Sequence, residues 1–417
     1  MRIIADFHIH SKYSRATSRD MDLPTINQWA KYKGIKLMGT GDFTHPFWLQ
    51  ELKRHLSPAG DGFYEYDGTY YFLTSELNCI YHKNGKPRRV HNLVVAPSFE
   101  IVEKINHRLS TYGNLLVDGR PILNLDCEDL VKMITDISDR CMIIPAHAWT
   151  PHFSVFGSNS GFNRLIDCFG SQIKNVHAIE TGLSSDPSMN WRLSFLDTIA
   201  LLSNSDAHSP ANIGREANVF DVKDYTVLYN EITEIIKSKD DAHFLYTIEF
   251  FPEEGKYHFD GHKNCEVNLH PKVSIEGGNL CPVCNKPLTI GVLHRVEELS
   301  DRQEGYQLPN AVPCRKIIPL EEIIAEALNL NKGASQVRKE YLGLVGMFGS
   351  EFKILLDLNE QELSRIQNMK IARNIIKMRT GAVAIVPGYD GVYGTIIINN
   401  SETANDPLAK LEQLSFF

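Results

Sequence analysis

The chain lacks long apolar runs. None of its hydrophobic stretches approaches the roughly 18 residues that a membrane-spanning helix requires, although hydrophobic residues make up 43% of its 417 positions. The opening residues, MRIIADFHIH, also lack the order of a secretory signal, in which positive charge precedes an apolar segment. These absences exclude an integral membrane protein, and we expect a cytoplasmic protein with no membrane partner.

Cysteine and positive charge are both scarce. The eight cysteines of this long chain are interpreted as thiols or metal ligands rather than as a disulfide framework. Lysine and arginine number 43 against 51 aspartates and glutamates, which gives a formal net charge of −8. A wholly basic nucleic-acid binder is therefore excluded, whereas a local basic groove is not.

Short β-rich runs alternate with helix-like stretches up to about residue 235. The stretch LPTINQWAKYKG has Pro24 near its start and Gly34 at its end, and Asp126 is a suitable N-cap for a second helix. The Asp67-Gly68 pair predicts a tight hairpin turn. Short strands joined by crossovers predict an α/β sheet or barrel.

The composition changes after this unit. Residues 250–290 are rich in Gly, Pro and Cys, which is typical of a small unit that needs a stabilising staple. Residues 315–379 are helix-like, and a strand, a Gly-rich turn and a second strand follow. We expect an α/β catalytic unit over 1–240, a zinc-ribbon-like unit over 241–300, a mainly helical unit over 301–400 and a flexible tail over 401–417.

Ionisable side chains follow the apolar runs of the first unit at the points where the runs stop. In a parallel barrel, the carboxyl ends of the strands form one mouth, so residues distant in sequence meet there. Imidazoles with carboxylates suit divalent metal ions such as zinc or manganese. The sequence therefore predicts a cluster of two or three divalent ions, zinc, manganese or magnesium. The candidate ligands are His8, His10, Asp42, His45, Glu76, His91, His147, Asp206 and His208, and Glu180 also stands at the end of an apolar run.

The motifs DFHIHSKYS, GTGDFTH, SELN, RRVHNL, PAHAW and NSDAHS resemble those of the PHP (polymerase and histidinol phosphatase) superfamily. This resemblance implies a distorted (β/α)7 barrel. It also implies catalytic ion sites at His8, His10, Glu76 and Asp206, at Glu76, His91 and His147, and at His208 with residues near Asp42. The chain departs from the superfamily pattern where Phe43 follows Asp42, with His45 two residues further on, and where SRAT follows the first motif.

A second set of ligand types lies in the Cys-rich unit. His262, Cys265, Cys281 and Cys284 form the pattern H-x2-C-x15-C-x2-C, whose paired spacing predicts one structural zinc ion. His258 and Cys314 are alternatives to His262 as the fourth ligand. The remaining cysteines, Cys79, Cys127, Cys141 and Cys168, are interpreted as buried thiols.

Basic residues are concentrated in the helical unit. Over 315–379, eleven lysines and arginines stand against eight aspartates and glutamates. Lys370, Arg373, Lys377 and Arg379 are expected along one helical face, either as a phosphate-binding surface or as a solvated face. Nearer the predicted metal ligands, Arg88 and Arg89 could clamp a phosphate, and Trp149 could stack a base or pack in the wall.

The motifs GKYHFDGHKNC, CPVCNKPLTIGVLHRVEELSDR, RKIIPLEEIIAEAL and PGYDGVYG extend the resemblance to the endonuclease Q family, over residues 1 to about 400. The resemblance implies hydrolysis of the DNA phosphodiester 5′ to a deaminated base (uracil, hypoxanthine or xanthine) or an abasic site. The damaged base would be flipped into a pocket, for which the candidate residues are Trp149, Ser184, Asn190 and Arg192. A small-molecule phosphomonoesterase and a non-catalytic clamp or helicase adaptor are the alternatives.

The last five residues, QLSFF, resemble the bacterial sliding-clamp peptide Q-L-x-(L/F)-F. Gln413, Leu414, Phe416 and Phe417 would occupy a hydrophobic groove at the end of a flexible tether. The alternative is an apolar end that packs on its own domain. The expected partners are therefore damaged DNA and the sliding clamp, in association with the nucleoid.

Overall fold

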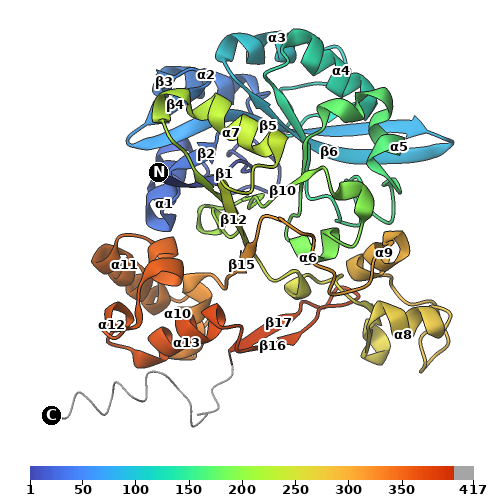
Figure 1. Cartoon of the computed structure of the whole chain (residues 1–417), viewed down its shortest axis with the longest axis vertical. Coiled ribbons are helices and arrows are strands. Elements are labelled where there is room, and N and C mark those ends of the chain that lie inside the picture. Colours follow the sequence, from blue (N-terminus) through green and yellow to red (C-terminus); the bar gives the residue numbers. More distant parts are fainter. Residues whose placement is uncertain (399–417) are drawn as a thin grey trace.

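The computed structural model describes residues 1–398 (Figure 1). The residues of the predicted clamp peptide, Gln413, Leu414, Phe416 and Phe417, lie outside this part of the chain. Within it, no helix is long and apolar enough to cross a membrane.

A distorted barrel forms the first part of the molecule. Its strands are β1 (Arg2–Asp6), β2 (Leu37–Gly39), β5 (Thr69–Lys83), β6 (Lys86–Ala96), β8 (Met142–Pro145), β9 (Ala178–Glu180) and β10 (Ala200–Leu202). Strands β1, β2 and β5 are parallel, as are β9 and β10, whereas β6 runs antiparallel to both β5 and β8. The ring closes where Ile9 forms a parallel bridge with Ala207. The predicted α/β fold, with seven barrel strands distorted by β6, is confirmed.

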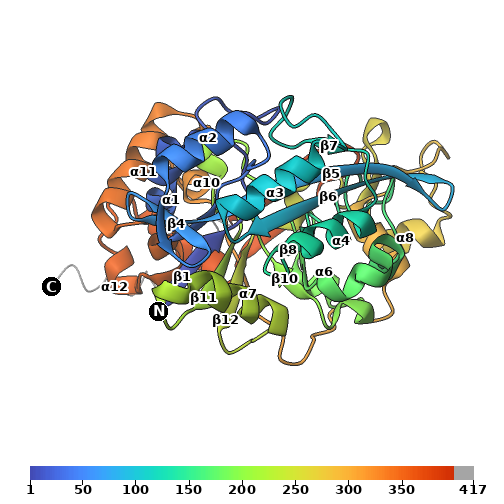
Figure 2. The ribbon, with the colours of Figure 1, turned by 90° about the horizontal axis from the view of Figure 1, so that it is seen from above.

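Helices cover the outside of the barrel (Figures 1 and 2). They are α1 (Leu23–Lys33), α2 (Pro46–His55), α3 (Phe99–Leu109), α4 (Cys127–Ile137), α5 (Leu165–Phe169), α6 (Pro187–Asn190) and α7 (Leu228–Ser238). Helix α1 is capped by the side chain of Asp22 and ends at Gly34, which has a φ of +88°. Asp126 caps α4 through the N–H of Glu128. Local capping chemistry thus determines both predicted ends.

A hairpin extends the sheet beside β5. Strands β3 (Ser57–Gly60) and β4 (Phe63–Tyr66) precede β5, and β4 pairs antiparallel with it. The connecting residues Asp67 and Gly68 have φ values of +46° and +85°. Two successive positive φ values define the tight turn that Asp-Gly favours, so the predicted hairpin is present. The short strand β7 (Ile122–Leu123) pairs with the other part of β5.

The sheet of the barrel continues beyond residue 240. Strand β11 (Ala217–Asp221) pairs with β1, β12 (Phe244–Glu249) pairs with β11, and β15 (Cys314–Lys316) pairs with β12. The boundary expected at residue 240 therefore falls between two paired strands.

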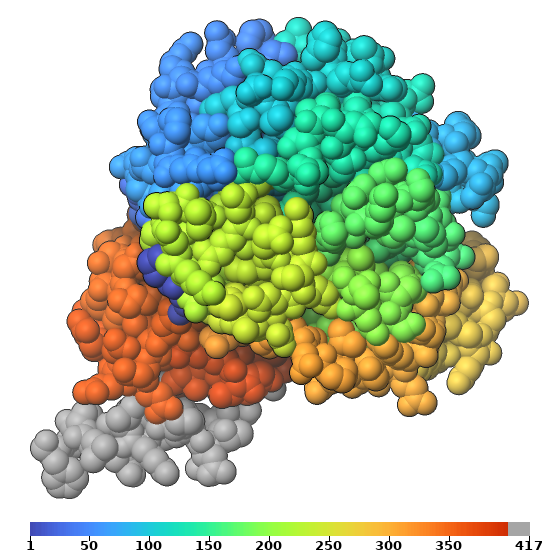
Figure 3. Space-filling model, turned by 45° about the horizontal axis from the view of Figure 1, so that its top comes forward, coloured from blue at the N-terminus to red at the C-terminus, as the bar shows by residue number. Residues whose placement is uncertain are grey.

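Two smaller units pack against the barrel (Figure 3). The zinc-ribbon-like unit contains β13 (Asp260–His262), β14 (Val267–Leu269), α8 (Pro271–Glu276) and α9 (Val292–Leu299). The helical unit contains α10 (Leu320–Leu328), α11 (Ser335–Phe348), the π-helical turn η7 (Lys353–Asp357), α12 (Glu360–Leu363) and α13 (Met369–Arg379). The predicted strand–turn–strand follows as β16 (Val383–Val386) and β17 (Thr395–Ile398), which pair antiparallel.

A buried ion pair joins the helical unit to the barrel. Nζ of Lys33 on α1 lies 2.7 Å from Oε2 of Glu351, and both side chains are 2% exposed. The hydroxyl of Tyr341 donates to the same Oε2, and the backbone N–H of Leu320 donates to Oε1. These donors satisfy a carboxylate that would be costly to bury alone.

Candidate metal centre

Three strand ends turn sharply where candidate ligands lie. Asp42 after β2, His147 after β8 and Asp206 after β10 have φ values of +48°, +31° and +47°. A positive φ is uncommon for residues other than glycine, and Asp and His tolerate it better than most. Such conformations gather at functional sites, and here they mark the mouth of the barrel.

Glu76 on β5 is the centre of the cluster. Its Oε1 atom lies 2.7 Å from Nδ1 of His91 and 2.9 Å from Nε2 of His147. Nε2 of His8 lies 3.6 Å from the same oxygen, and Nε2 of His10 lies 3.5 Å from Oε2. One buried carboxylate therefore contacts the imidazoles of both ligand groups that were predicted to share it.

Asp206 and His208 extend the cluster beyond His10. Nε2 of His10 lies 3.0 Å from Oδ1 of Asp206, and the rings of His10 and His208 have centres 4.4 Å apart. Ligand atoms lie within 4.8 Å of one another in each of three groups: His8, His10 and Glu76; His10, Asp206 and His208; and Glu76, His91 and His147. His208 thus joins His10 and Asp206 instead of the residues near Asp42.

The predicted ligands Asp42 and His45 lie outside these groups. Oδ1 of Asp42 is 3.0 Å from Nδ1 of His10, and its Oδ2 accepts hydrogen bonds from the N–H and the hydroxyl of Ser11. Both oxygens are therefore engaged, and Asp42 orients His10 from behind. Nε2 of His45 lies 3.1 Å from the carbonyl oxygen of Leu116. The expectation of a third ion site formed by His208 with residues near Asp42, and of Asp42 and His45 as ligands, is corrected accordingly.

Glu180 and Arg120 complete the surroundings of the cluster. Oε2 of Glu180 lies 2.9 Å from Nδ1 of His8, which fixes that ring as Asp42 fixes His10. Its position at a strand end was the sequence signal for Glu180. Nη1 of Arg120 lies 3.4 Å from Oε2 of Glu76. Arg120 comes from the loop before β7, and no motif in the sequence marks it.

Opposite charges in the cluster shift each other's pKa values. Burial alone would lower the pKa of His8, but the surrounding carboxylates, Glu180 foremost, raise it to about 10. Against the same effect of burial, Asp206 contributes most to raising the pKa of His10 to about 9. Burial would raise the pKa of Glu76, whereas the imidazoles around it hold that pKa well below its usual value. The carboxylates thus create a site that favours cations.

The donor set fits divalent ions. Nε2 of His8 and Nε2 of His91 are buried and have no hydrogen-bond partner. Buried polar atoms normally have one, and imidazole nitrogens beside carboxylate oxygens suit zinc, manganese or iron. The residues at this mouth therefore match the predicted divalent-metal centre in chemistry.

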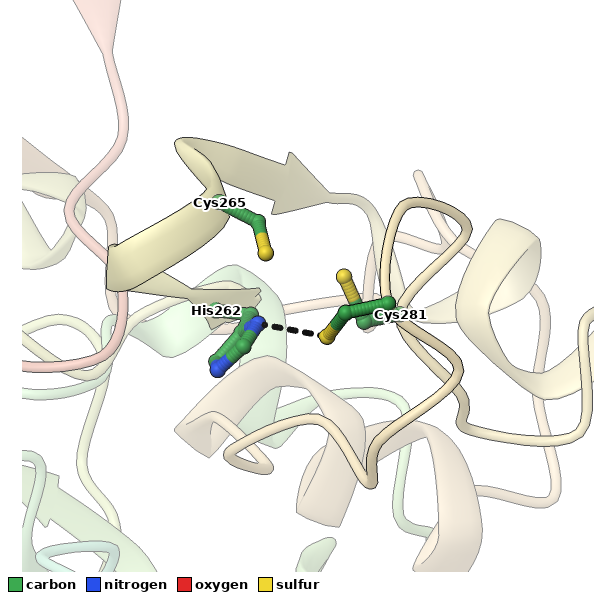
Figure 4. A group of neighbouring side chains, drawn as sticks. His262, Cys265 and Cys281 are labelled. Atoms are coloured by element: carbon green, nitrogen blue, oxygen red, sulfur yellow. Dashed lines mark hydrogen bonds between the residues drawn. The ribbon is translucent and has the colours of Figure 1, made fainter.

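The second ligand set meets in the zinc-ribbon-like unit (Figure 4). One ligand atom each from His262, Cys265, Cys281 and Cys284 lies within 4.8 Å of the others. Figure 4 shows the labelled side chains of His262, Cys265 and Cys281 pointing toward one another. Burial would raise the pKa of Cys281, but the backbone N–H groups of Cys284 and Val283 lower it to about 6. These N–H groups favour the thiolate, the form that binds zinc. Cys314 instead lies in the barrel sheet, on β15.

Trp149 and Arg192 are structural residues. Trp149 is 1% exposed, donates through Nε1 to Asn190 (2.8 Å) and packs on Phe156. It therefore packs in the wall, and the prediction that it stacks a base is wrong. Asn190 is fully buried, which removes it from the candidate pocket. Arg192 is 4% exposed and its Nη2 lies 2.6 Å from Oε2 of Glu297 on α9, so it joins the barrel to the zinc-ribbon-like unit.

Arg88 and Arg89 differ in their surroundings. The Arg88 guanidinium donates to the carbonyl oxygen of Gly161 and lies 4.1 Å from the centre of the Phe162 ring. Arg89 is exposed, and its guanidinium lies 5.6 Å from the ring centre of Phe153, a ring that packs beside His91. Arg89 is therefore the member of the pair whose side chain faces solvent.

The basic helix α13 presents a smaller face than predicted. Lys370, Arg373 and Lys377 follow a spacing of three and four residues, which places them on one side of the helix. Arg379 instead donates to the carbonyl oxygens of Leu355 (2.7 Å) and Ile354 (2.8 Å) in η7. The sequence could not show that η7 would present carbonyl groups to Arg379.

Comparisons with known proteins agree with this architecture. Residues 319–382 match the family described as the MJ0043 C-terminal domain. The uncharacterized protein YqxK of Bacillus subtilis is 29% identical over 411 residues, which cover 95% of this chain and 99% of that protein.

Two solved structures are similar over almost the whole chain. The lesion-specific endonuclease PfuEndoQ of Pyrococcus furiosus is 32% identical, with a TM-score of 0.86, 98% of this chain covered and 99% of that chain. A structure of Endonuclease Q in complex with a 27-mer duplex substrate, with an abasic lesion at the active site, is also 32% identical. Its TM-score is 0.84, with 98% of this chain and 100% of that chain covered.

Proposed function

The chain belongs to the endonuclease Q family of DNA endonucleases, and on this premise we propose that it is a repair enzyme that hydrolyses DNA 5′ to a damaged nucleotide. The proposed lesions are the deaminated bases uracil, hypoxanthine and xanthine, and abasic sites. A related protein holds a duplex with an abasic lesion at its active site, which supports the abasic site as one substrate.

The contact of Glu76 with four imidazoles carries the proposal. We assign His8, His10, Asp206 and His208 to ions on one side of Glu76, and His91 and His147 to an ion on the other side. Divalent ions held together in this way polarise phosphoryl oxygens and lower the pKa of water. Asp42 and Glu180 keep the rings of His10 and His8 in the orientation that ligation requires.

Arg120 is the proposed phosphate-binding residue of the site. Its guanidinium lies at the edge of the cluster, 3.4 Å from Oε2 of Glu76, and is partly exposed. A planar guanidinium donates to two oxygens of a phosphate at once. We assign Arg120 to the non-bridging oxygens of the scissile phosphate, where it orients the diester and stabilises the charge that develops on it.

DNA contacts are assigned to basic residues outside the cluster, of which Arg89 and Lys370 are exposed and Arg373 and Lys377 are partly buried. Arg89 lies beside Phe153 near His91, and Lys370, Arg373 and Lys377 share one side of α13. Phosphate contacts of this kind supply affinity without sequence preference. The damaged base would leave the stack, at a cost that is lowest for a damaged or mispaired base.

The proposal also includes one structural zinc ion, binding to the sliding clamp and association with the nucleoid. His262, Cys265, Cys281 and Cys284 would hold one structural zinc ion, which stabilises a unit with little core of its own. The sequence at 413–417 would bind the sliding clamp and bring the enzyme to DNA at the nucleoid. Deletion of 413–417 should abolish co-elution with the clamp and leave nicking of a short duplex unchanged.

A panel of end-labelled duplexes, each with one damaged base, tests the main proposal. We expect a nick on the 5′ side of the lesion, none in the undamaged duplex, and loss of nicking after chelation of divalent ions. Cleavage that survives chelation would contradict the mechanism. Hydrolysis of a phosphate monoester without any nick in the panel would favour the phosphomonoesterase instead.

A further inference from the structure

The loop between α3 and β7, residues 110–121, lies at the mouth of the barrel beside the N-terminal end of α2. Its last part carries Arg120, which contacts Glu76. The carbonyl oxygen of Leu116 lies 3.1 Å from Nε2 of His45, and the carbonyl oxygen of Gly119 accepts a hydrogen bond from Thr44. At both of these points the loop is therefore attached to the segment that follows β2, beside the metal centre.

Gly119 shows how closely the loop packs. A Cβ atom at this position would lie 2.4 Å from Oδ2 of Asp42 and 2.5 Å from Oγ of Ser14, so only glycine fits there. The N–H of Gly119 also donates to the carbonyl oxygen of Tyr13. These contacts leave the loop little room to shift relative to the cluster.

The opposite side of the same loop presents apolar side chains to solvent. Leu116 is 53% exposed and Val117 is 56% exposed. Phe47, at the start of α2, is 54% exposed, and its ring centre lies 5.8 Å from that of His45. We call Phe47, Leu116 and Val117 the apolar rim. Adjacent exposed apolar side chains on a fixed loop usually mark a binding surface.

Positive charge lies beside the apolar rim. The Arg15 side chain is 70% exposed, and its Nε lies 3.5 Å from Oδ2 of Asp118 in the same loop. Arg120 lies on the inner side of the loop, and Arg19 is exposed in the segment that follows Arg15. A surface that combines exposed apolar side chains with arginines suits a nucleic acid, whose apolar base faces lie between two lines of phosphates.

We infer that the apolar rim is a wedge that enters the base stack of damaged duplex DNA beside the flipped nucleotide. This inference rests on the proposed function, because it requires a lesion whose phosphate lies at the metal centre. Leu116 and Val117 would occupy the space that the flipped base leaves, and Phe47 would support them from α2. Apolar wedges of this kind offset part of the cost of unstacking.

The double variant Leu116→Ser/Val117→Ser tests the wedge. Both side chains are more than half exposed, and the anchoring bond to His45 uses a backbone oxygen, so the fold should persist. We expect the ratio of duplex to single-strand cleavage at one lesion to fall about tenfold, because only the duplex must be unstacked before the damaged base can leave the helix. Val227→Ser, at an exposed apolar residue near α7, is the control and should leave the ratio unchanged.

A binding measurement provides a second readout. A non-cleavable duplex with 2-aminopurine next to an abasic-site analogue should become more fluorescent when the metal-loaded wild-type protein binds it. The double variant should produce no such increase at saturating protein. An unchanged cleavage ratio, or an equal increase in fluorescence, would overturn the wedge while the endonuclease assignment stands. Absence of cleavage of any lesion by the wild-type protein would overturn both.

Discussion

Lys33 on the barrel and Glu351 in the helical unit form an ion pair of 2.7 Å that is almost fully buried. The variant Lys33→Met should lower the free energy of unfolding by about 3–5 kcal/mol, because it leaves Glu351 buried without its partner. Chemical denaturation monitored by circular dichroism measures this. Lys31→Met, on the same helix, removes an exposed pair with Asp67 and should cost less than about 1 kcal/mol. Equal costs would show that burial of the pair is unimportant.

The variants His147→Ala and His45→Ala test which of two predicted metal ligands binds an ion. The structure keeps His147 in a ligand group and leaves His45 outside all of them. Nε2 of His147 faces Glu76, whereas Nε2 of His45 faces a backbone carbonyl. His147→Ala should lose the ion assigned to His91 and His147 and all nicking, with its circular dichroism spectrum preserved. His45→Ala should retain the metal content of the wild-type protein, as measured by mass spectrometry. Loss of metal from His45→Ala would restore His45 as a ligand.

Arg120→Gln tests the phosphate-binding role. Removal of one charged donor from a transition-state site typically lowers the rate about 10²–10³-fold. We expect a loss of this size in single-turnover nicking, with metal content unchanged because Arg120 supplies no ligand atom. Arg120→Lys should recover only part of the rate, since an ammonium cannot donate to two oxygens in the same plane. A full rate for Arg120→Gln would contradict the assignment.

Cys281→Ser should remove the structural zinc ion and leave the barrel cluster occupied. Zinc content should fall by one equivalent per chain, and the thermal transition should move to lower temperature, since zinc binding contributes directly to folding. Cys141→Ser is the matched control, because Cys141 is a buried thiol outside the described ligand groups. Unchanged zinc content in Cys281→Ser would contradict the four-ligand site.

Glu249 makes stability depend on pH. It is fully buried on β12, and burial raises its pKa from the usual 4.5 to about 8. Between these two values the folded chain keeps a proton that the unfolded chain releases, so stability falls as pH rises from about 4.5 to 8. Glu249→Gln should remove this part of the decline and be the more stable form at pH 8, by denaturant titration. If the stability of Glu249→Gln depended on pH as that of the wild-type protein does, Glu249 would not be the group responsible. Glu234→Gln, at an exposed position, is the control.

The sequence predicted the features that depend on local chemistry. Asp22, Gly34 and Asp126 determine helix ends through contacts within a few residues, and Asp67-Gly68 determines a turn in the same way. The strand-end ligands were also predictable, because barrel topology brings such residues together whatever their spacing. His8, His10, His147 and Asp206, which follow strand ends, obey that rule, whereas Glu76 lies within β5 and His91 within β6.

Partners distant in sequence were not predictable. Trp149 is buried against Asn190, and Arg192 is paired with Glu297 more than a hundred residues away. In the sequence, these side chains look the same as free binding residues. His45 carried the right ligand type at a suitable place, yet the carbonyl group of Leu116 faces its ring. Arg120 was missed because its loop has no motif and only the fold brings it to Glu76.

The pairing of β15 with β12 has a consequence for synthesis on the ribosome. Strand β12 pairs with β11 on one side and with β15 on the other. A nascent chain that has emerged only as far as β12 therefore has an open strand edge, and such edges invite pairing with other chains. The residues of the zinc-ribbon-like unit lie between β12 and β15 in the sequence. The ribosome must therefore synthesise that whole unit before β15 can pair with the open edge of β12.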